Sequence, residues 1–363
     1  MKRFLVSFTI TLLLLFVMIG VFVYIEDPFY HYHGPLFNEE AYMDNAVYQT
    51  PGAAKHFTYD AVIVGSSMTE NFRSSWFEEM DLKLLKLSYA GAKFRDYKTI
   101  IDKVFESGNQ VKLVMTDINE FQLLSEVEAV YEEYPSYLYD DRIINDTGYI
   151  FNDDVFWESA DRALEAGFYH DLKLDDSYTW EEAELFSEEN ARKDYDTFVE
   201  QLKLSCEDGS YTRSTREEML EKCRQNMDYL IYTIKEHPDT RFVFYYPPYS
   251  VLFWEEAVAE DNCEDVLELY RVSMERLLTC DNVLIFNFQD DEELVTDLSR
   301  YRDVCHHDPQ GNRFIYECVR DTINGSGKYC DAYIVNHENI DEHLDNVRRI
   351  LEDYQSEAEQ LEN

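Results

Sequence analysis

The chain has 363 residues, of which 45% are apolar and 15% aromatic. This composition supplies enough side chains for a large buried core and excludes wholesale disorder. The formal net charge of -42 at pH 7 repels phosphate backbones and anionic head groups, which argues against nucleic acid as a partner. The acidity favours solubility, or else the attraction of cations and of cationic or neutral polymers at a cell surface.

The N-terminal stretch from Phe4 to Ile25 is almost entirely apolar and carries no charge. About 20 such residues cross the hydrocarbon core of a bilayer as a helix. Two basic residues precede the stretch and two acidic residues follow it, so the positive-inside rule leaves the short N-terminus in the cytoplasm. Residues 1–26 are therefore predicted to be a single-pass anchor in the cell membrane, with the main domain outside the cytoplasm.

A cleaved signal peptide is the alternative interpretation of this stretch. Cleavage would require a shorter apolar segment followed by a small-x-small site. The apolar run instead continues through Val21–Tyr24 without such a site, so an uncleaved anchor is favoured. No later apolar stretch in the sequence is long enough to cross a membrane.

Residues 27–57 are rich in Tyr, His, Pro and Asn and are predicted to form an irregular lead-in to the folded domain. His31 and His33 alternate with tyrosines in this segment. Two alternating histidines in an aromatic loop are more often packed and hydrogen-bonded than metal-bound. A metal site is therefore not expected in this segment. We also expect no cofactor in the protein.

The remaining chain, residues 58–363, alternates short apolar runs with longer amphipathic segments. Continuous apolar strands separated by helices indicate a parallel sheet that is covered on both faces. We therefore predict a three-layer α/β/α domain with a mostly parallel five-stranded sheet of the flavodoxin-like type. The five predicted strands are residues 60–64, 82–87, 111–116, 241–246 and 283–288.

Predicted helices lie between these strands, and one region interrupts the alternation. Helices are expected at residues 94–106, 215–235 and 263–278, and a C-terminal helix carries an apolar stripe from Ile340 to Tyr354. Residues of about 120–214 are dense in aromatic and acidic side chains, and we interpret them as a mostly helical insertion. Insertions at the carboxyl ends of strands commonly shape the ligand crevice of an α/β domain.

The cysteines indicate no zinc site. All seven lie in the second half of the chain, and neither a Cys-x-x-Cys motif nor a Cys/His spacing typical of zinc occurs. Outside the cytoplasm some of them could form disulfides, and the odd number leaves at least one thiol free unless chains pair.

A serine motif, Gly65-Ser66-Ser67, follows the first predicted strand directly. A glycine allows a sharp turn there, and a hydroxyl at the start of the next helix lies beside free backbone N–H groups. Such a position suits a nucleophile whose attack creates an oxyanion. The alternative is a helix-capping turn, since serines commonly cap helices.

A second motif, Asp303-Val-Cys-His306, lies in a polar loop after the last predicted strand. An Asp three residues before a His can orient the imidazole through Nδ1, which leaves Nε2 free to take a proton from serine. The serine motif and this pair are expected at the same carboxyl edge of the sheet, where α/β active sites form. His307 has a less suitable offset from Asp303, and Cys305 is not expected to be the nucleophile while Ser67 is available.

With these motifs the chain resembles the SGNH, or GDSL-type, hydrolase superfamily, and within it the membrane-anchored envelope members similar to the teichoic-acid D-alanylation and alginate acetylation proteins. The resemblance covers roughly residues 60–120 and 240–325. It implies that Ser67 is the nucleophile and that Asp303 and His306 complete the triad. It also implies an oxyanion hole formed by Ser67, Gly91 and Asn119, although the third block here, Asp117-Ile-Asn119, lacks the glycine of the family motif.

The resemblance implies a serine O-acyl esterase or acyltransferase that acts outside the cytoplasm on a cell-envelope polysaccharide or glycolipid. A polytopic membrane acyltransferase is the candidate protein partner. The alternative is a catalytically weak or inactive envelope binding or assembly protein with the same fold. The incomplete third block and the aromatic insertion favour that alternative. Trp157 and Trp180 in the insertion, and Trp254 after the fourth strand, can stack on sugars or fill the core.

Overall fold

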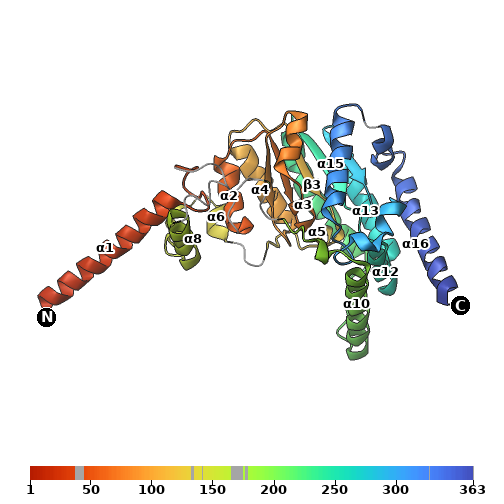
Figure 1. The fold of residues 1–363 in the computed structure, drawn as a ribbon, viewed down its shortest axis with the longest axis horizontal. Coiled ribbons are helices and arrows are strands. Elements are labelled where there is room, and N and C mark those ends of the chain that lie inside the picture. The colour runs from red at the N-terminus through yellow and green to blue at the C-terminus, as the bar shows by residue number, and fades with distance from the viewer. Residues whose placement is uncertain are drawn as a thin grey trace.

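Five parallel strands form one sheet at the centre of the computed structural model (Figure 1). The model describes residues 1–36, 45–131, 135–140, 142–164, 175, 179–326 and 328–362. The strands are β1 (Ala61–Gly65), β2 (Leu84–Ser88), β3 (Leu113–Asp117), β4 (Arg241–Tyr246) and β5 (Val283–Asn287), in the order β2-β1-β3-β4-β5. This is a doubly wound order, in which the chain moves first to one edge and then to the other. The prediction of an α/β fold with a five-stranded parallel sheet is confirmed.

The strands are short, mostly apolar runs, and β1, β2 and β3 are buried along their whole length, as the predicted parallel sheet requires. In β1 and β2, Ala61 pairs with Leu84 and Gly65 pairs with Ser88. The predicted start at Leu82 is therefore two residues too early, because the ladder with β1 begins at Leu84. Their carboxyl ends, Gly65 and Ser88, lie side by side at one edge of the sheet.

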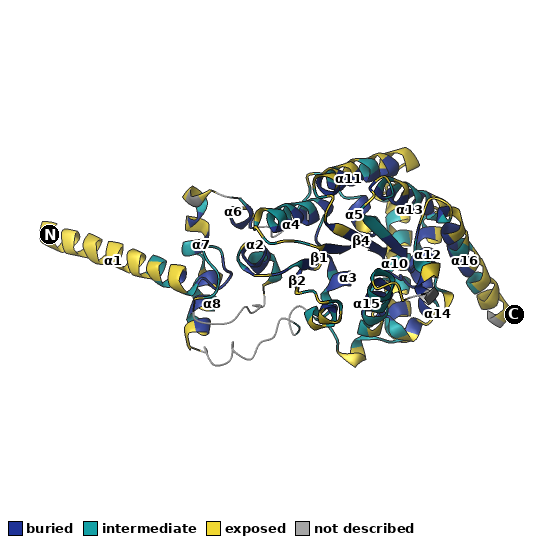
Figure 2. Cartoon of the chain, turned by 90° about the horizontal axis from the view of Figure 1, so that it is seen from above, coloured by how far each residue is buried: buried dark blue, intermediate teal, exposed yellow. Residues whose placement is uncertain are grey.

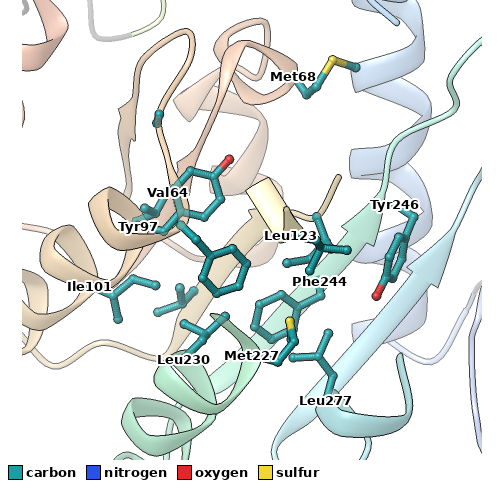
Figure 3. Packing of buried hydrophobic residues seen from close by; sticks show 14 of the residues in the cluster. Val64, Met68, Tyr97, Ile101, Leu123, Met227, Leu230, Phe244, Tyr246 and Leu277 are labelled. Carbon is teal, nitrogen blue, oxygen red and sulfur yellow. The ribbon is translucent and has the colours of Figure 1, made fainter. Parts of the chain in front are cut away.

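Alternate residues of the strands build two separate cores, one on each face of the sheet. Val64 and Phe244 face the first core, where they pack with side chains of α4 (Phe94–Glu106), α11 (Arg216–Glu236) and α13 (Cys263–Leu277) (Figure 3). Ile63 and Val243 face the second core, with α15 (Pro309–Ile323) and η1 (Ser74–Met80). Figure 2 shows helices on both sides of the sheet. The fold therefore has three layers.

Further helical segments are described along the chain. They are α1 (Lys2–Glu26), α2 (Ala46–His56), α3 (Ser67–Glu70), α5 (Glu120–Leu123), α6 (Ser136–Tyr139), η2 (Ile143–Asn145), α7 (Thr147–Ile150), α8 (Asp153–Leu164), η4 (Ala183–Leu185), α10 (Glu188–Asp208), α12 (Val251–Ala259), α14 (Glu292–Val295), η5 (Leu298–Arg300), η6 (Lys328–Tyr333) and α16 (Ile340–Glu362).

The predicted helices lie within a residue or so of the observed ones, and the described residues between β3 and α11 form helices joined by loops, without a strand. The apolar stripe of α16 is buried from Ile340 to Leu351, and Tyr354 packs against the core. Part of the predicted insertion, such as residues 165–174, lies outside the described residues.

The lead-in contains a helix, α2, where the sequence predicts irregular structure. The Asn45 side chain caps it by accepting the N–H of Tyr48. Pro51 lies inside α2 and cannot bond the carbonyl of Val47, but the Tyr139 hydroxyl donates to that carbonyl at 2.8 Å. A tertiary contact thus replaces the hydrogen bond that proline removes, which the local sequence does not reveal.

Helix α1 projects away from the rest of the molecule (Figure 1). Its most apolar window has a mean hydropathy of 2.7, and in the described part of the chain it alone is long and apolar enough to cross a membrane. Most of its side chains are exposed, whereas Val23 near its end is buried. The structure thus agrees with the predicted anchor in length and composition.

Candidate active site

The turn after β1 is so tight that only glycine fits at its first position. A Cβ on Gly65 would lie 2.3 Å from Thr69 Cγ2 and 2.5 Å from Asp117 Oδ1. Ser66 then caps the short helix α3, and Ser67 is its first residue. The backbone N–H of Ser67 therefore has no acceptor within that helix.

Asp117, at the carboxyl end of β3, fixes the position of this turn through hydrogen bonds to Ser66. Its carboxylate accepts hydrogen bonds from the Ser66 hydroxyl at 2.6 Å, the Ser66 N–H at 3.1 Å and the Tyr97 hydroxyl at 2.7 Å. The Asn119 amide donates to it at 3.1 Å. Burial raises the pKa of Asp117, and the hydrogen bonds from Ser66 and Tyr97 oppose that rise. Four donors around one fully buried carboxyl make it a rigid junction between β1, β3 and α4.

Ser67, His306 and Asp303 form one continuous chain of hydrogen bonds. The Ser67 Oγ lies 2.7 Å from His306 Nε2. His306 Nδ1 lies 2.7 Å and 2.8 Å from the two carboxylate oxygens of Asp303. A carboxylate can only accept, so Nδ1 carries the proton and Nε2 presents its lone pair to the serine hydroxyl. This is the tautomer that a general base needs.

The loop that carries Asp303 and His306 closes on the aspartate itself. The backbone N–H groups of Cys305 and His306 both donate to Asp303 Oδ1, at 2.9 Å and 2.8 Å. Burial raises the pKa of Asp303, but the hydrogen bonds and charge of His306 outweigh it and hold the pKa below its usual range. Asp303 therefore stays ionised, and its negative charge can orient the neutral His306 ring and stabilise the imidazolium.

The two other predicted oxyanion donors lie on the same pocket wall. Gly91 follows β2 with a φ of 73°, a left-handed conformation that favours glycine. Asn119 uses its Oδ1 to cap α5 by accepting the Gln122 N–H, and one of its two amide hydrogens goes to Asp117. The second amide hydrogen has no protein acceptor among the described residues. The structure thus brings four of the five predicted site residues to one pocket, and the fifth, Asp303, is hydrogen-bonded to His306 on its wall.

This pocket has a volume of about 490 Å³, a size typical of small-molecule sites. Its walls contain Ser67, His306, Gly91, Asn119 and several aromatic and aliphatic side chains. A second cavity of about 450 Å³ shares Phe121, Tyr249 and Cys305 with it and extends past Glu120 and Glu256. The two cavities therefore adjoin each other at these three shared residues.

Trp180 is a site residue whose role the sequence does not reveal. It belongs to residues 179–187, which we call the strap, and its ring lies edge-on to the His306 ring at 5.2 Å between centroids. Its indole N–H donates to Glu70 at 3.0 Å, and its backbone exchanges two hydrogen bonds with Asn71. The strap is thus fastened to the segment that directly follows the nucleophile.

Glu70, which binds Trp180 of the strap, also interacts with a buried lysine. Burial raises the pKa of Glu70, while the charge of Lys86 opposes the rise. Lys86 is fully buried in β2, donates to the Phe72 carbonyl at 3.2 Å and also contacts the Glu70 carbonyl. Burial lowers the pKa of Lys86 to about 8. Only the placement of a Lys inside an apolar strand could have drawn attention to this contact.

The two rival catalytic residues have unsuitable surroundings. Burial lowers the pKa of His307 to about 4, and its Nδ1 faces the Asp308 carbonyl at 3.0 Å rather than Asp303. Burial, together with the charge of Asp303, raises the pKa of the Cys305 thiol well above its usual value, so it stays protonated and weakly nucleophilic.

The alternating histidines of the lead-in make protein contacts. His33 Nε2 lies 2.8 Å from the Tyr24 carbonyl and Nδ1 lies 2.7 Å from the Gly34 carbonyl, while His31 Nε2 lies 3.3 Å from Asp146. Among the described residues, no group of three or more His, Cys, Asp or Glu side chains is arranged to hold a metal ion.

The two other tryptophans considered as sugar platforms lie away from this pocket. Trp254 is buried in the core beside Tyr270, and Trp157 lies exposed on α8.

Comparison with known proteins finds no family model that matches the chain and no curated protein that matches it in sequence.

Proposed function

We propose that this protein is a serine O-acyl esterase or acyltransferase of the SGNH type, anchored by α1 and acting outside the cytoplasm on a cell-envelope polysaccharide or glycolipid. The observation that carries the proposal is the continuous chain of hydrogen bonds from Ser67 through His306 to Asp303 on the wall of a pocket. Serine hydrolases of unrelated folds use a serine, an imidazole and a carboxylate in this arrangement.

In the first half-reaction, the Ser67 Oγ attacks the carbonyl carbon of an ester. His306 Nε2 takes the hydroxyl proton, and the negative charge develops on the former carbonyl oxygen. The Ser67 and Gly91 N–H groups and the free amide hydrogen of Asn119 are the candidate donors to that oxygen. When the intermediate collapses, His306 returns the proton to the leaving alcohol, and an acyl-enzyme remains on Ser67.

In the second half-reaction, a hydroxyl group attacks the acyl-enzyme and gives its proton to His306. Water as the attacking group gives a carboxylic acid, and a sugar hydroxyl gives a new ester. Ser67 regains the proton when it leaves. Asp303 holds the imidazole in one tautomer throughout and stabilises the imidazolium that forms in each half-reaction.

The remaining features favour a substrate at the envelope. An anchored domain with its site on a pocket wall can reach polymers and lipids near the membrane surface, and a polytopic membrane protein is a candidate acyl donor. The second cavity beside Phe121 and Tyr249 supplies space for the acyl chain or for the sugar that accepts it.

Labelling by a fluorophosphonate probe tests the assignment of the nucleophile. We expect the full chain in detergent to be labelled at Ser67, and Ser67→Ala to abolish both labelling and the hydrolysis of a small acetyl ester. Removing a triad member costs roughly 10³-fold or more in rate.

The exposed Ser210 is the matched control, because Ser210→Ala removes a hydroxyl from a loop outside the pocket and should leave labelling unchanged. A folded wild-type protein that stays unlabelled and inactive, yet binds envelope glycan, would instead support the non-catalytic binding or assembly protein.

A further inference from the structure

The chain that leaves α1 is rigidly clamped to the domain. Asp27 is fully buried, and its carboxylate accepts backbone N–H groups of residues 31–33 and the Tyr149 hydroxyl at 2.8 Å. The guanidinium of Arg162, on α8, contacts the Pro28 carbonyl at 3.3 Å and lies 4.9 Å from the centre of the Tyr30 ring. The direction of α1 is therefore fixed relative to α7 and α8.

The second half of α1 packs against residues 147–164, which form α7 and α8 and which we call the foot. Phe16 meets Phe151 edge-on at 5.4 Å between ring centroids, and Phe22 meets Phe156 at 5.9 Å. Figures 1 and 2 both show α8 beside the carboxyl end of α1, away from the sheet.

The length of α1 determines how deep these contacts lie. At 1.5 Å per residue, the apolar stretch from Phe4 to Ile25 is about 33 Å long, close to the roughly 30 Å of a bilayer core. Phe16 lies about 14 Å along the helix from Ile25. Phe22, which contacts Phe156, lies only about 5 Å from Ile25. If α1 spans the bilayer, the foot therefore reaches from near the middle of the bilayer at Phe151 to just below the head groups at Phe156, beside Trp157.

We propose that the foot is inserted in the outer leaflet and forms a second, monotopic membrane contact beside α1. The proposal rests on the membrane insertion of α1 but is independent of the catalytic activity. Insertion would bury in lipid the apolar side chains of the foot that the protein core leaves exposed. Phe151 is 49% exposed, Trp157 is 63% exposed and Leu164 is 84% exposed. Interfacial helices bury such faces about 5–10 Å into the boundary between head groups and acyl chains.

The charges of the foot favour zwitterionic lipid over anionic lipid. Asp153, Asp154 and Asp161 are exposed on α8, while its Arg162 is buried against the chain after α1. Apolar burial, rather than charge attraction, must therefore drive insertion, and Trp157 has the ring type enriched at the membrane–water interface. A second membrane protein could cover the same side chains, but continuity with α1, whose surface is mostly exposed to the same depth, favours lipid.

Quenching by brominated lipid tests the insertion. The full chain is reconstituted into phosphatidylcholine vesicles, with bromine on shallow or deep acyl carbons in separate samples. The fluorescence of Trp157 is obtained by subtracting the emission of Trp157→Phe from that of wild type. We expect the bromines to quench this Trp157 fluorescence, most strongly when they are on shallow acyl carbons. Resistance of the vesicle-bound chain to alkaline extraction reports the insertion of α1 separately.

A pair of variants tests whether the foot depends on apolar contact with lipid. Phe151→Asp should weaken the quenching of Trp157, whereas Leu204→Asp, which changes a 55% exposed leucine on α10, should leave it unchanged. An extraction-resistant α1 with no quenching of Trp157 would overturn the proposal and indicate a protein cover or water. If α1 itself is extracted, the proposed anchoring fails and the foot fails with it.

Discussion

At the scale of single residues, Ser66 and Ser67 differ in the groups that their hydroxyls meet. The Ser66 hydroxyl donates to the buried Asp117, whereas the Ser67 hydroxyl faces the lone pair of His306. The Ser66 proton is held by a carboxylate that has three other donors, so this hydroxyl is a poor nucleophile. The Ser67 proton faces the base that would remove it.

Asp303→Asn is expected to lower kcat by roughly 10³- to 10⁴-fold, because an amide can donate to Nδ1 and so favours the wrong tautomer of His306. The measurement is the rate of acetyl-ester hydrolysis by the full chain in detergent. Asp239→Asn changes an exposed aspartate outside the pocket and should leave the rate unchanged. Because the triad acts as a unit, Ser67→Ala with Asp303→Asn should be no slower than Ser67→Ala alone. Full activity of Asp303→Asn would exclude the assigned role.

Glu256 is expected to make the folded state less stable as the pH rises. Burial raises its pKa to about 8, and nearby carboxylates add to the rise. Between about pH 4.5 and pH 8 the folded state therefore binds more protons at Glu256 than the unfolded state does, so stability falls across this window. The groups around it are Asp194, Glu260, Glu120 and Asp303, with Lys93 on the same cavity.

The Tm of the full chain in detergent, measured at pH 5.5 and pH 8.5, tests this effect. Glu256→Gln should show a smaller loss of Tm between the two pH values than wild type does. Glu207→Gln, at an exposed position on α10, should behave as wild type. An equal loss in all three proteins would assign the pH dependence to other groups.

At the scale of elements, the strap joins two parts of the site that are far apart in sequence. Glu181 pairs with Arg73 at 2.6 Å just after the nucleophile helix, and the Ser187 N–H donates to the Tyr301 carbonyl at 3.0 Å just before the catalytic loop. Trp180, directly before Glu181, packs edge-on against His306. We therefore expect the strap to help position the imidazole through this ring contact.

Trp180→Ala is expected to lower kcat on the order of tenfold to hundredfold, because small displacements of a catalytic group cost rates of that size. Trp180→Phe keeps an aromatic edge against His306 and should restore most of kcat, although it loses the hydrogen bond to Glu70. Steady-state kinetics on one ester substrate separates this positioning effect from binding. A change in KM alone would show that Trp180 only binds substrate.

At the scale of the whole molecule, the cysteines report the compartment in which the domain folds. The sulfurs of Cys318 in α15 and Cys330 in η6 lie 2.8 Å apart and are fully buried. In an oxidising compartment, exchange with an oxidant disulfide converts the two thiols to a disulfide and reduces the oxidant to two thiols. We expect that bond in protein purified from membranes.

Alkylation of the unfolded chain without reductant, followed by mass spectrometry, tests the bond. Cys318 and Cys330 should stay unmodified, whereas the buried Cys223 should be alkylated once the chain unfolds. Modification of all seven cysteines would argue against a domain that folds outside the cytoplasm.

Local patterns in the sequence determined the strands, most helices and the apolar N-terminal helix. Buried parallel strands need unbroken apolar runs and membrane-spanning helices need long ones, so both are visible in a single stretch of chain. The motifs around Ser67 and His306 were visible for a similar reason, because a turn glycine and a three-residue spacing are local features. The carboxyl ends of parallel strands share one edge, so the sequence could also predict that the two motifs meet.

The tertiary structure alone decided the contacts between segments that are distant in sequence. The helix α2 contains a proline whose lost hydrogen bond is replaced by Tyr139, so local propensity was misleading there. Trp180 meets His306, Asp117 joins two strands to α4, and α8 lies against α1. Such contacts depend on how helices and loops pack in three dimensions, and no periodicity or spacing within one segment encodes them.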